Sequence, residues 1–319
     1  MRVGFIGAGG ASRSHMENVR KAEGFEVGAI CDIDAARAKQ AAQRYGGNAY
    51  ARYDEMYEKE QLDAVVISIP PHVHGEPELM AIERGCHLFI EKPVGLDLDT
   101  CKKIRDAAKG KVVTCVGYHW RYTKATEQAR ALLNGKPLAL AAGYWTGGVY
   151  GPMWWRTKSQ SGGQLVEQTT HIVDLARHLV GDVVRVRAVS RRGLMTDVPG
   201  YDIDDASVVQ LEFKNGVIGM IVSACTLNFG YRIELDLVGR DFVIEIGGNK
   251  VTQMTGGLTS TWEYRESPYD AEMGAFLKAI KTKDSSGIRS TYADALKTLA
   301  VCLAANKSME SGRSVRPGA

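Results

Sequence analysis

The sequence predicts a two-domain protein: a doubly wound parallel α/β sheet in residues 1–120, then an α+β domain in residues 121–319 with a large, mostly antiparallel open sheet. Three observations predict this fold class. Short apolar runs alternate with amphipathic stretches up to about residue 120, as in sheets built from βαβ units. A glycine cluster ends the first apolar run. Beyond residue 180 strand patterns dominate, and Asn215-Gly216 is a favoured hairpin turn.

Composition narrows the class of protein. The chain has 319 residues, of which 45% are hydrophobic and 24% charged, which is typical of a globular protein with a large core. The net charge of +3 comes without a basic block, so we expect no nucleic-acid partner. No apolar run approaches the roughly 20 residues of a membrane span. Six scattered cysteines without a C-x-x-C pair predict buried, reduced thiols in a cytoplasmic protein.

The first strand, turn and helix are the strongest local signal. The apolar run from Val3 to Ile6 predicts a strand, and residues 12–22 predict a helix. The spacing Gly7-x-Gly9-x-x-Ser12 between them approximates a dinucleotide fingerprint. One glycine permits the tight turn, the next lets the backbone approach a pyrophosphate, and the helix N-terminus attracts its charge. An ordinary strand-to-helix turn is the alternative. The predicted cofactor-binding residues are Gly7, Ala8, Gly9, Gly10 and Ala11.

The second strand, residues 25–31, ends at an acidic residue. Asp32 is placed to accept hydrogen bonds from the ribose hydroxyls and to repel a 2′-phosphate, so NAD is favoured over NADP. The alternative is a helix-capping role, for which Asp34 competes. Ile33 adjoins this cofactor-binding position. Arg37 can meet a 2′-phosphate, although a solvated helix arginine is the favoured interpretation.

The remaining elements of the first domain place further polar residues. The expected helices are residues 34–45, 54–57, 75–84 and 97 or 99 to 109, and the expected strands are residues 49–50, 64–69, 87–90 and 112–116. Ligands of doubly wound sheets lie beyond the carboxyl ends of the strands. Polar side chains there are therefore candidate cofactor or substrate contacts. They are Ser68, Pro70, His74, Glu91 and Lys92 for the cofactor, and Tyr118 and His119 for the substrate.

Lys92 is the main catalytic candidate in this domain. It follows an apolar strand and precedes a proline, and a strand-end lysine can donate to a substrate hydroxyl and stabilise alkoxide charge. The alternative is a solvated surface lysine. Glu91 either pairs with Lys92 or lines the nicotinamide. His72 and His74 lack a third ligand at suitable spacing, so we expect no metal site.

The second domain begins with a predicted helix over residues 123–133 and a strand over residues 137–145, followed by a loop rich in glycine and tryptophan over residues 146–156. Aromatic faces suit the C–H surfaces of sugars. Trp154, Trp155 and Arg156 are therefore expected to shape a sugar or polyol pocket, with packing of the loop as an equal alternative.

A polar stripe is predicted on the next helix, which extends to Leu179. Glu167, His171, Asp174 and His178 are spaced by four, three and four residues, which places them on one helical face. His171 is the expected general base, because histidine titrates near neutral pH, and Glu167 or Asp174 is expected to orient it. A solvated face of an amphipathic helix is the alternative.

The last third predicts most of the second sheet. The expected strands are residues 183–191, 206–213, 217–224, 233–238 and 242–246, and the expected late helices are residues 269–281 and 291–311. One apolar sheet face is left without predicted helices, so we expect it to associate with another copy of the chain.

Residues 69–93, IPPHVHGEPELMAIERGCHLFIEKP, resemble the Gfo/Idh/MocA oxidoreductase family, through a strand ending in proline, a following histidine and a strand ending in Glu-Lys-Pro. The resemblance continues through Gly117-Tyr118, Arg121-Tyr122 and the Gly162-Gly163 segment, where Glu167 replaces the family aspartate and His171 and Asp174 match. It implies NAD-dependent hydride transfer at a secondary alcohol of a sugar or polyol. It also implies that Lys92, His171, Glu167 and Asp174 are catalytic, that Tyr118, His119, Arg121, Trp154, Trp155, Arg156 and His171 contact the substrate, and that the protein is a homodimer or homotetramer.

Two other functions remain open. Some relatives of the family are NAD-dependent glycosidases, which oxidise a sugar transiently and would cleave glycosides without net NADH. Others are non-catalytic sensors of sugar or NAD. Such sensors can lack the lysine and the histidine, both of which are present here as Lys92 and His171.

Overall fold

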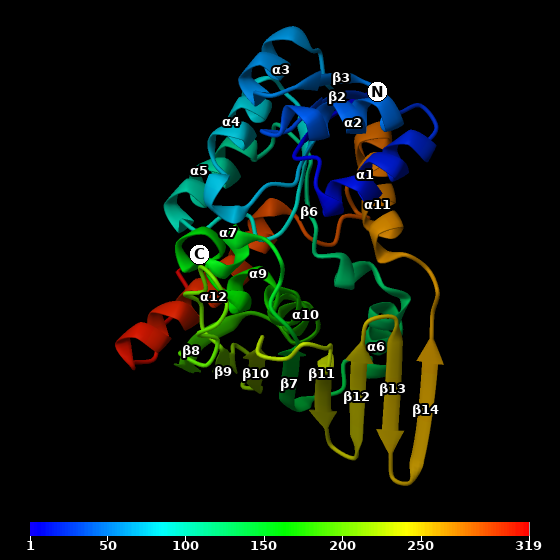
Figure 1. Ribbon diagram of the computed structural model, residues 1–319. Coiled ribbons are helices and arrows are strands. Elements are labelled where there is room, and N and C mark those ends of the chain that lie inside the picture. The colour runs from blue at the N-terminus through cyan, green and yellow to red at the C-terminus, as the bar shows by residue number, and fades with distance from the viewer. Residues whose placement is uncertain (319) are drawn as a thin grey trace. The chain divides into compact units, whose positions relative to one another are not determined.

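The computed structural model describes residues 1–318. These form two compact units (Figure 1). The first unit consists of Met1–His119 and Ser267–Ala295, and the second consists of Trp120–Glu266 and the chain from Leu296 onward. The division therefore differs from the predicted one mainly in residues 267–295, which belong to the first unit; the boundary between the units also lies one residue earlier than predicted, after His119.

The first unit is built on a six-stranded parallel sheet of order β3-β2-β1-β4-β5-β6. Its strands are β1 (Arg2–Ile6), β2 (Glu26–Cys31), β3 (Asn48–Tyr50), β4 (Ala64–Ile67), β5 (His87–Ile90) and β6 (Thr114–Val116). From β1 the chain adds β2 and β3 on one side of the sheet and then β4, β5 and β6 on the other side, which confirms the predicted doubly wound topology. The carboxyl ends of these two strands are where such folds bind their ligands.

The helices of the first unit follow the predicted pattern closely. They are α1 (Gly10–Lys21), α2 (Ala35–Tyr45), α3 (Tyr53–Lys59), η1 (Pro71–Val73), α4 (Glu76–Glu83), α5 (Leu98–Ala108) and α11 (Pro268–Thr282). The Asp34 side chain accepts hydrogen bonds from two backbone N–H groups and caps α2, as expected. Asp97 caps α5 by accepting a hydrogen bond from the backbone N–H of Thr100. Helix α3 is longer than the expected helix over residues 54–57, because Arg52 occupies its N-cap and Asp54 lies in its first turn.

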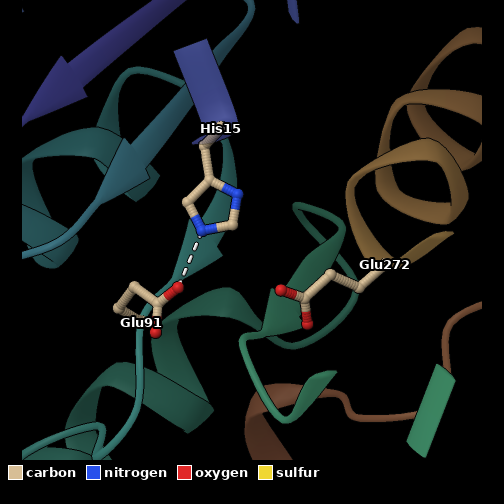
Figure 2. Close-up of side chains that lie close together, drawn as sticks. All are labelled: His15, Glu91 and Glu272. Atoms are coloured by element: carbon tan, nitrogen blue, oxygen red, sulfur yellow. Dashed lines mark hydrogen bonds and ion pairs between the residues drawn. The ribbon is translucent and has the colours of Figure 1, made fainter. Parts of the chain in front are cut away.

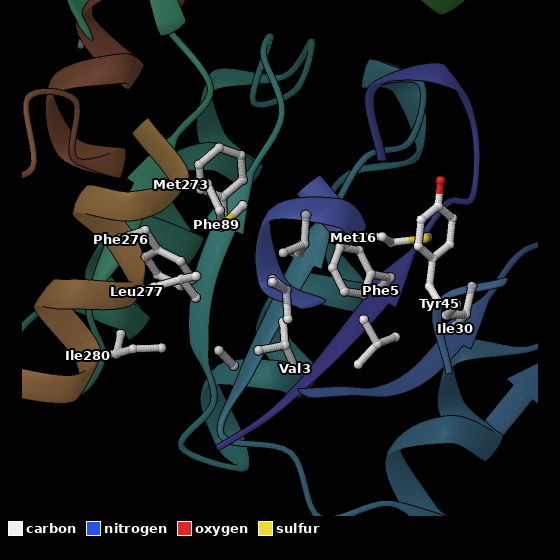
Figure 3. Close-up of a cluster of buried hydrophobic side chains, with 14 of the residues drawn as sticks. Val3, Phe5, Met16, Ile30, Tyr45, Phe89, Met273, Phe276, Leu277 and Ile280 are labelled. Carbon is white, nitrogen blue, oxygen red and sulfur yellow. The ribbon is translucent and has the colours of Figure 1, made fainter. Parts of the chain in front are cut away.

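Helix α11 completes the core of the first unit although it lies far along the chain. Figure 3 shows its side chains beside those of the central strands, with Met273, Phe276 and Ile280 packed into the same cluster as Phe5 and Phe89. The rings of Phe89 and Phe276 are 5.8 Å apart. Burial of large apolar side chains such as these is the main stabilising contribution to a domain. The first unit therefore depends on a segment from the C-terminal part of the sequence.

The second unit contains an eight-stranded sheet of order β14-β13-β12-β11-β7-β10-β9-β8. Its strands are β7 (Leu138–Thr146), β8 (Val183–Arg191), β9 (Ala206–Phe213), β10 (Ile218–Ala224), β11 (Arg232–Gly239), β12 (Phe242–Gly247), β13 (Lys250–Thr255) and β14 (Leu258–Glu263). Only β7 and β10 pair in parallel, which confirms a mostly antiparallel sheet. Strands β13 and β14 were not predicted, because KVTQMT and LTSTWE lack the apolar alternation of a half-buried strand.

Helices cover one face of this sheet. The helices of the second unit are η2 (His119–Tyr122), α6 (Lys124–Leu133), α7 (Met153–Arg156), α8 (Lys158–Ser161), α9 (Gln164–Glu167), α10 (Thr170–Val180) and α12 (Tyr292–Ser311), of which η2 and α12 begin in the first unit. Helix α6 packs on β12 and β13, and α10 packs on β7 and β11. The prediction that residues 146–156 form a loop throughout is wrong at its end, where the MWWR segment forms α7.

The face of the sheet opposite these helices exposes apolar side chains. Val189 on β8 is 64% exposed and pairs in register with Val208 on β9. Ile218 on the neighbouring strand β10 is 53% exposed. Among residues 1–318, no helix has the length and apolar character needed to cross a membrane.

Candidate active site

The turn between β1 and α1 is closed on one side and open on the other. Gly7 has φ +92°, and a Cβ atom there would lie 2.1 Å from the backbone oxygen of Ser68, so only glycine fits. The Ser12 hydroxyl donates to the carbonyl of Gly7 at 2.5 Å and so stabilises the turn. By contrast, Cβ atoms at Gly9 and Gly10 would meet no heavy atom within 4 Å. This is the arrangement that close approach of a pyrophosphate to the backbone requires.

Asp32 ties this turn to the end of β2. Its Oδ2 accepts a hydrogen bond from the N–H of Ala8 at 2.8 Å, and its Oδ1 accepts one from the N–H of Asp34 at 2.9 Å. Arg37 is an exposed residue of α2, as expected of a solvated helix arginine, and its guanidinium also lies 3.3 Å from both carboxylate oxygens of Asp32. The neighbouring Ile33 is 95% exposed. The acid is therefore fixed in place while its surroundings remain accessible.

The segment after β4 is held by internal contacts. Pro70 precedes η1, and the buried His74 contacts Glu78 through its Nδ1. The second oxygen of Glu78 accepts a hydrogen bond from the N–H of Gly75 at 2.8 Å. The Ser68 hydroxyl is buried without a hydrogen-bond partner. The side chain of His74 is thus anchored to α4 through Glu78.

The Glu91-Lys92 pair at the end of β5 combines a buried acid with a half-buried lysine. Glu91 accepts a hydrogen bond from Nε2 of His15 at 2.7 Å, and its Oε2 accepts one from the backbone N–H of Lys92 at 3.3 Å. A Cβ atom at Gly117 would lie 2.9 Å from Oε2, so glycine leaves the space that the carboxylate occupies. Burial raises the pKa of Glu91, but the hydrogen bond from His15 and the charge of Lys92 outweigh it and hold that pKa below its usual value.

His119 lies near the same acid. Its ring stacks on Tyr269 with the centroids 4.5 Å apart. Burial lowers the pKa of His119 to about 4, with smaller opposing and supporting effects from Glu91 and Lys92. At neutral pH His119 is therefore an uncharged imidazole, suited to hydrogen bonding. The preceding Tyr118 is fully buried.

In the second unit, Glu167 and His171 come from two short helices and not from one. Glu167 ends α9, and α10 begins at Thr170, so the predicted continuous stripe is wrong. Consecutive threonines have low helix propensity, and the Thr169 hydroxyl accepts a hydrogen bond from Ser223 at 2.9 Å. These features accompany the break. Glu167 accepts a hydrogen bond from Nε1 of Trp155 at 2.6 Å.

His171 lies in the first turn of α10 and is 4% exposed. Its ring stacks on Trp145 of β7, with centroids 5.8 Å apart and planes inclined by 19°. The tryptophan restricts the orientation of the imidazole. Sequence reasoning missed this contact because the two residues are far apart in the chain.

Two other predicted site residues contact each other. Arg121 donates from Nε and Nη2 to the two oxygens of Asp174, at 2.6 and 2.5 Å, and both side chains are buried. The hydroxyl of Thr298 also donates to Asp174 at 2.8 Å, and it accepts from Arg177 at 2.7 Å. Asp174 is fully buried, so a solvated polar stripe is also wrong at this position. The outer histidine, His178, accepts a hydrogen bond from Arg130 at 2.6 Å.

The tryptophan segment is anchored within the second unit. Trp155 is fully buried in a cluster with Ile203 and Cys225, and Trp154 packs against the same cluster. Arg156 donates to the carbonyls of Gly151 and Pro199, at 2.7 and 3.4 Å. These contacts favour packing as the role of Trp155. All six cysteines are buried, as predicted.

Several residues around the site were not singled out from the sequence. They are His15, Glu78, Trp145, Glu272 and Thr298. Of these, His15 had a local signal, since it lies on the buried face of α1 together with Met16 and Val19. The others depend on contacts between distant segments, which no local pattern reveals.

Family comparisons agree with the two-part organisation. Residues 1–119 match the model of the GFO/IDH/MocA oxidoreductase family, described as an NAD-binding Rossmann fold. Residues 122–245 match the GFO/IDH/MocA C-terminal domain. The two matches together span most of the chain.

Individual relatives are similar over nearly their whole length. The myo-inositol 2-dehydrogenase of Thermotoga maritima is 27% identical over 334 residues, covering 99% of this chain and 98% of the relative. The scyllo-inositol 2-dehydrogenase (NAD(+)) of Bacillus subtilis is 26% identical over 338 residues, covering 99% and 96%. A solved structure of levoglucosan dehydrogenase in complex with NADH superposes with a TM-score of 0.85 at 20% identity, covering 100% of this chain and 99% of the other. That last likeness concerns the fold.

Proposed function

The chain belongs to the GFO/IDH/MocA family of oxidoreductases, and from this we propose that it is an NAD-dependent dehydrogenase acting on a secondary alcohol of a sugar or polyol. The observation that supports this most is the first unit's combination of an open Gly9–Gly10 turn, a fixed Asp32 and a strand-end Lys92. The relatives named above, which act on inositols or bear the name of levoglucosan, favour a cyclic substrate with several hydroxyl groups.

The cofactor residues fit NAD. The turn has space for the pyrophosphate at Gly9 and Gly10, and α1 directs free N–H groups and the positive end of its dipole toward it. The carboxylate of Asp32 can accept hydrogen bonds from the ribose hydroxyls of NAD. Its negative charge would repel the 2′-phosphate of NADP. Ala11 and Ile33 border the same region, and Ser68 and Pro70 follow the neighbouring strand β4.

NAD, when bound, accepts the hydride at its nicotinamide ring. The chain's own residues handle the proton and the developing charge. Lys92 donates a hydrogen bond to the reacting oxygen and stabilises its alkoxide character, and His171 takes the hydroxyl proton as general base. Trp145 orients the His171 ring, and Glu167, fixed by Trp155, adds an acceptor. His119, uncharged at neutral pH, is suited to contact a substrate hydroxyl.

Arg121 and Asp174 receive a different role from the one expected. Because each satisfies the other, with Thr298 as a third partner, we assign them to holding α10 and thereby His171 in position. Trp154 and Arg156 border the anchored segment, and contact with substrate is proposed for Trp154 alone, since it is only partly buried.

A screen of alcohols tests the proposed activity. Purified protein is mixed with NAD⁺ and, in turn, with inositols, monosaccharides and anhydro-sugars, and NADH is followed by its absorbance. We expect NADH to form with at least one cyclic polyol. Cleavage of a glycoside without net NADH would instead establish the glycosidase alternative, and NAD binding without either reaction would favour a sensor.

We also propose that the protein is cytoplasmic and forms a homodimer or homotetramer through the exposed face of the second unit's sheet. Its buried cysteines suit a reducing compartment. Val189 and Val208, which are paired, and Ile218, which lies further along the neighbouring strand β10, provide exposed apolar surface that association would bury. Light scattering should give a mass of two or four chains for the native protein and a smaller mass for Val208→Lys. A native monomer at micromolar concentration would refute the oligomer.

A further inference from the structure

A second acid lies close to Glu91 inside the first unit. Figure 2 shows His15 from α1, Glu91 from the end of β5 and Glu272 from α11 directed toward one another. One ligand atom from each lies within 4.8 Å of those of the other two. Glu272 is fully buried, and neither of its oxygens has a hydrogen-bond partner. This residue is outside every role assigned above.

The cluster cannot hold two ionised carboxylates without further positive charge. Like charges at this separation repel strongly in buried surroundings, and one of the two acids takes up a proton instead. Glu91 has the stabilising partners: His15 at 2.7 Å, the N–H of Lys92, and the nearby charge of Lys92. Glu272 has none of these, so it is the acid that is protonated.

The electrostatic effects of the neighbouring groups also favour a protonated Glu272. Burial raises the pKa of Glu272 well above its usual value, and the charge of Glu91 adds to the effect. The groups that face the cluster come from four elements: His15 on α1, Glu91 and Lys92 after β5, His119 on η2, and Tyr269 and Glu272 on α11. The pKa of Tyr269 is raised to about 12 by burial and by the charge of Glu91, so Tyr269 is uncharged at neutral pH.

We propose that Glu272 is a positioning residue, a neutral carboxylic acid whose O–H group faces the ionised Glu91 and restrains the backbone at Lys92. Gly117 confines Glu91 from another side, where a Cβ atom would overlap its carboxylate, and His15 holds it from a third. The backbone N–H of Lys92 donates directly to the carboxylate of Glu91. A shift of this carboxylate would therefore also shift the backbone at Lys92. The effect on catalysis rests on the proposed function; the protonation of Glu272 does not.

Two substitutions separate a neutral acid from an ionised one. Glu272→Gln keeps the size and the polar groups of the neutral acid, whereas Glu272→Leu removes them. We expect Glu272→Leu to lower kcat about tenfold, the scale of one lost hydrogen bond to a charged group, with KM for NAD⁺ little changed, and Glu272→Gln to restore most of the rate. A Leu variant with wild-type kcat would overturn the positioning role.

The pH dependence of stability reports the proton without needing a substrate. In the unfolded chain Glu272 has the ordinary glutamate pKa of about 4.3. In the folded chain its pKa is higher, so the proton is retained to higher pH. The wild type therefore loses stability as pH rises between these two pKa values, and Glu272→Gln does not. Urea midpoints should be equal near pH 4 and higher for Glu272→Gln at pH 8. Glu83→Gln, an exposed change on α4, is the control and should leave the pH profile unaltered.

Infrared spectroscopy gives the same test directly. At neutral pH the wild type should show the carbonyl stretch of a buried, protonated carboxylic acid, and Glu272→Gln should lose it while Glu83→Gln keeps it. Absence of that band, together with a destabilised Glu272→Gln variant, would contradict the proposal.

If elemental analysis of the wild type then found one divalent cation per chain, lost in Glu272→Gln, the cluster would be a cation site. If no alcohol is oxidised, the proposed function fails while the band and the midpoints still decide the state of Glu272.

Discussion

The two units place their candidate functional residues by different means. In the first unit, the turn residues are fixed by local backbone chemistry: Gly7 by its positive φ, and Asp32 by N–H groups from residues 8 and 34. In the second, Asp174 is fixed by Arg121, 53 positions earlier, and by Thr298, 124 positions later. The first kind of site is visible in a short motif, and the second exists only after the chain has folded.

The largest expected effect is on stability in the second unit. Arg121→Met leaves the fully buried Asp174 without its charged partner, and removing one member of a buried ion pair destabilises by about 3–5 kcal/mol. Urea unfolding followed by circular dichroism measures the loss. The double variant Arg121→Met/Asp174→Leu should recover much of it, because no uncompensated charge remains. A single variant as stable as the native protein would show that the buried pair does not support α10.

A contrast between two glycines should be nearly as large in the first unit. Gly7→Ala forces a Cβ atom against the Ser68 carbonyl at an unfavourable φ, and should destabilise by about 1–3 kcal/mol. Gly9→Ala has open space for its Cβ, so the free protein should keep its Tm while the affinity for NADH falls. Differential scanning fluorimetry with and without NADH measures both. Equal NADH affinity for Gly9→Ala and wild type would place the pyrophosphate elsewhere.

Cofactor choice should change by a smaller amount. Asp32→Asn retains the shape and one acceptor but loses the charge that opposes a 2′-phosphate, and Arg37 is then available to a phosphate. The preference for NADH over NADPH, measured by fluorescence titration, should fall by about tenfold, the scale of a hydrogen bond to a charged group. Asp34→Asn, which preserves a helix cap, is the control. A native protein that binds NADPH more tightly would reverse the assignment of Asp32.

The smallest expected effect is at the outer end of α10. His178→Ala removes a partly exposed side chain that accepts a hydrogen bond from Arg130, and should change kcat less than about twofold and stability by no more than about 0.5 kcal/mol. Steady-state kinetics and thermal melts measure both. A large loss of kcat would extend the functional region along the helix beyond His171.

Much of the fold could be predicted because its signals are local. The glycine turn, the Asp34 cap and the Asn215-Gly216 hairpin each depend on residues within one or two turns of chain. Strands β13 and β14 were not predicted because their sequences are largely polar. The packing of α11 in the core of the first unit was not predicted either, because its partners in that core, such as Phe5 and Phe89, lie far from it in the sequence.

The candidate site divides in the same way. The strand-end position of Lys92 and the spacing of Glu167 and His171 were apparent from the sequence, but their partners were not. The break between α9 and α10 was missed because a regular four-residue spacing continues through two consecutive threonines. His15 and Glu272 were missed because the acid they accompany lies on a third element.

The central claim is that Lys92 and His171 act in one chemical step. The decisive measurement is kcat, with NADH affinity, for Lys92→Met, His171→Ala and the double variant on an accepted alcohol. Each single change should lower kcat by about 10²- to 10⁴-fold with NADH binding retained, and the double variant should be little worse than either, because residues that act together share one transition state. Near-native kcat for His171→Ala, or losses that multiply in the double variant, would contradict the claim.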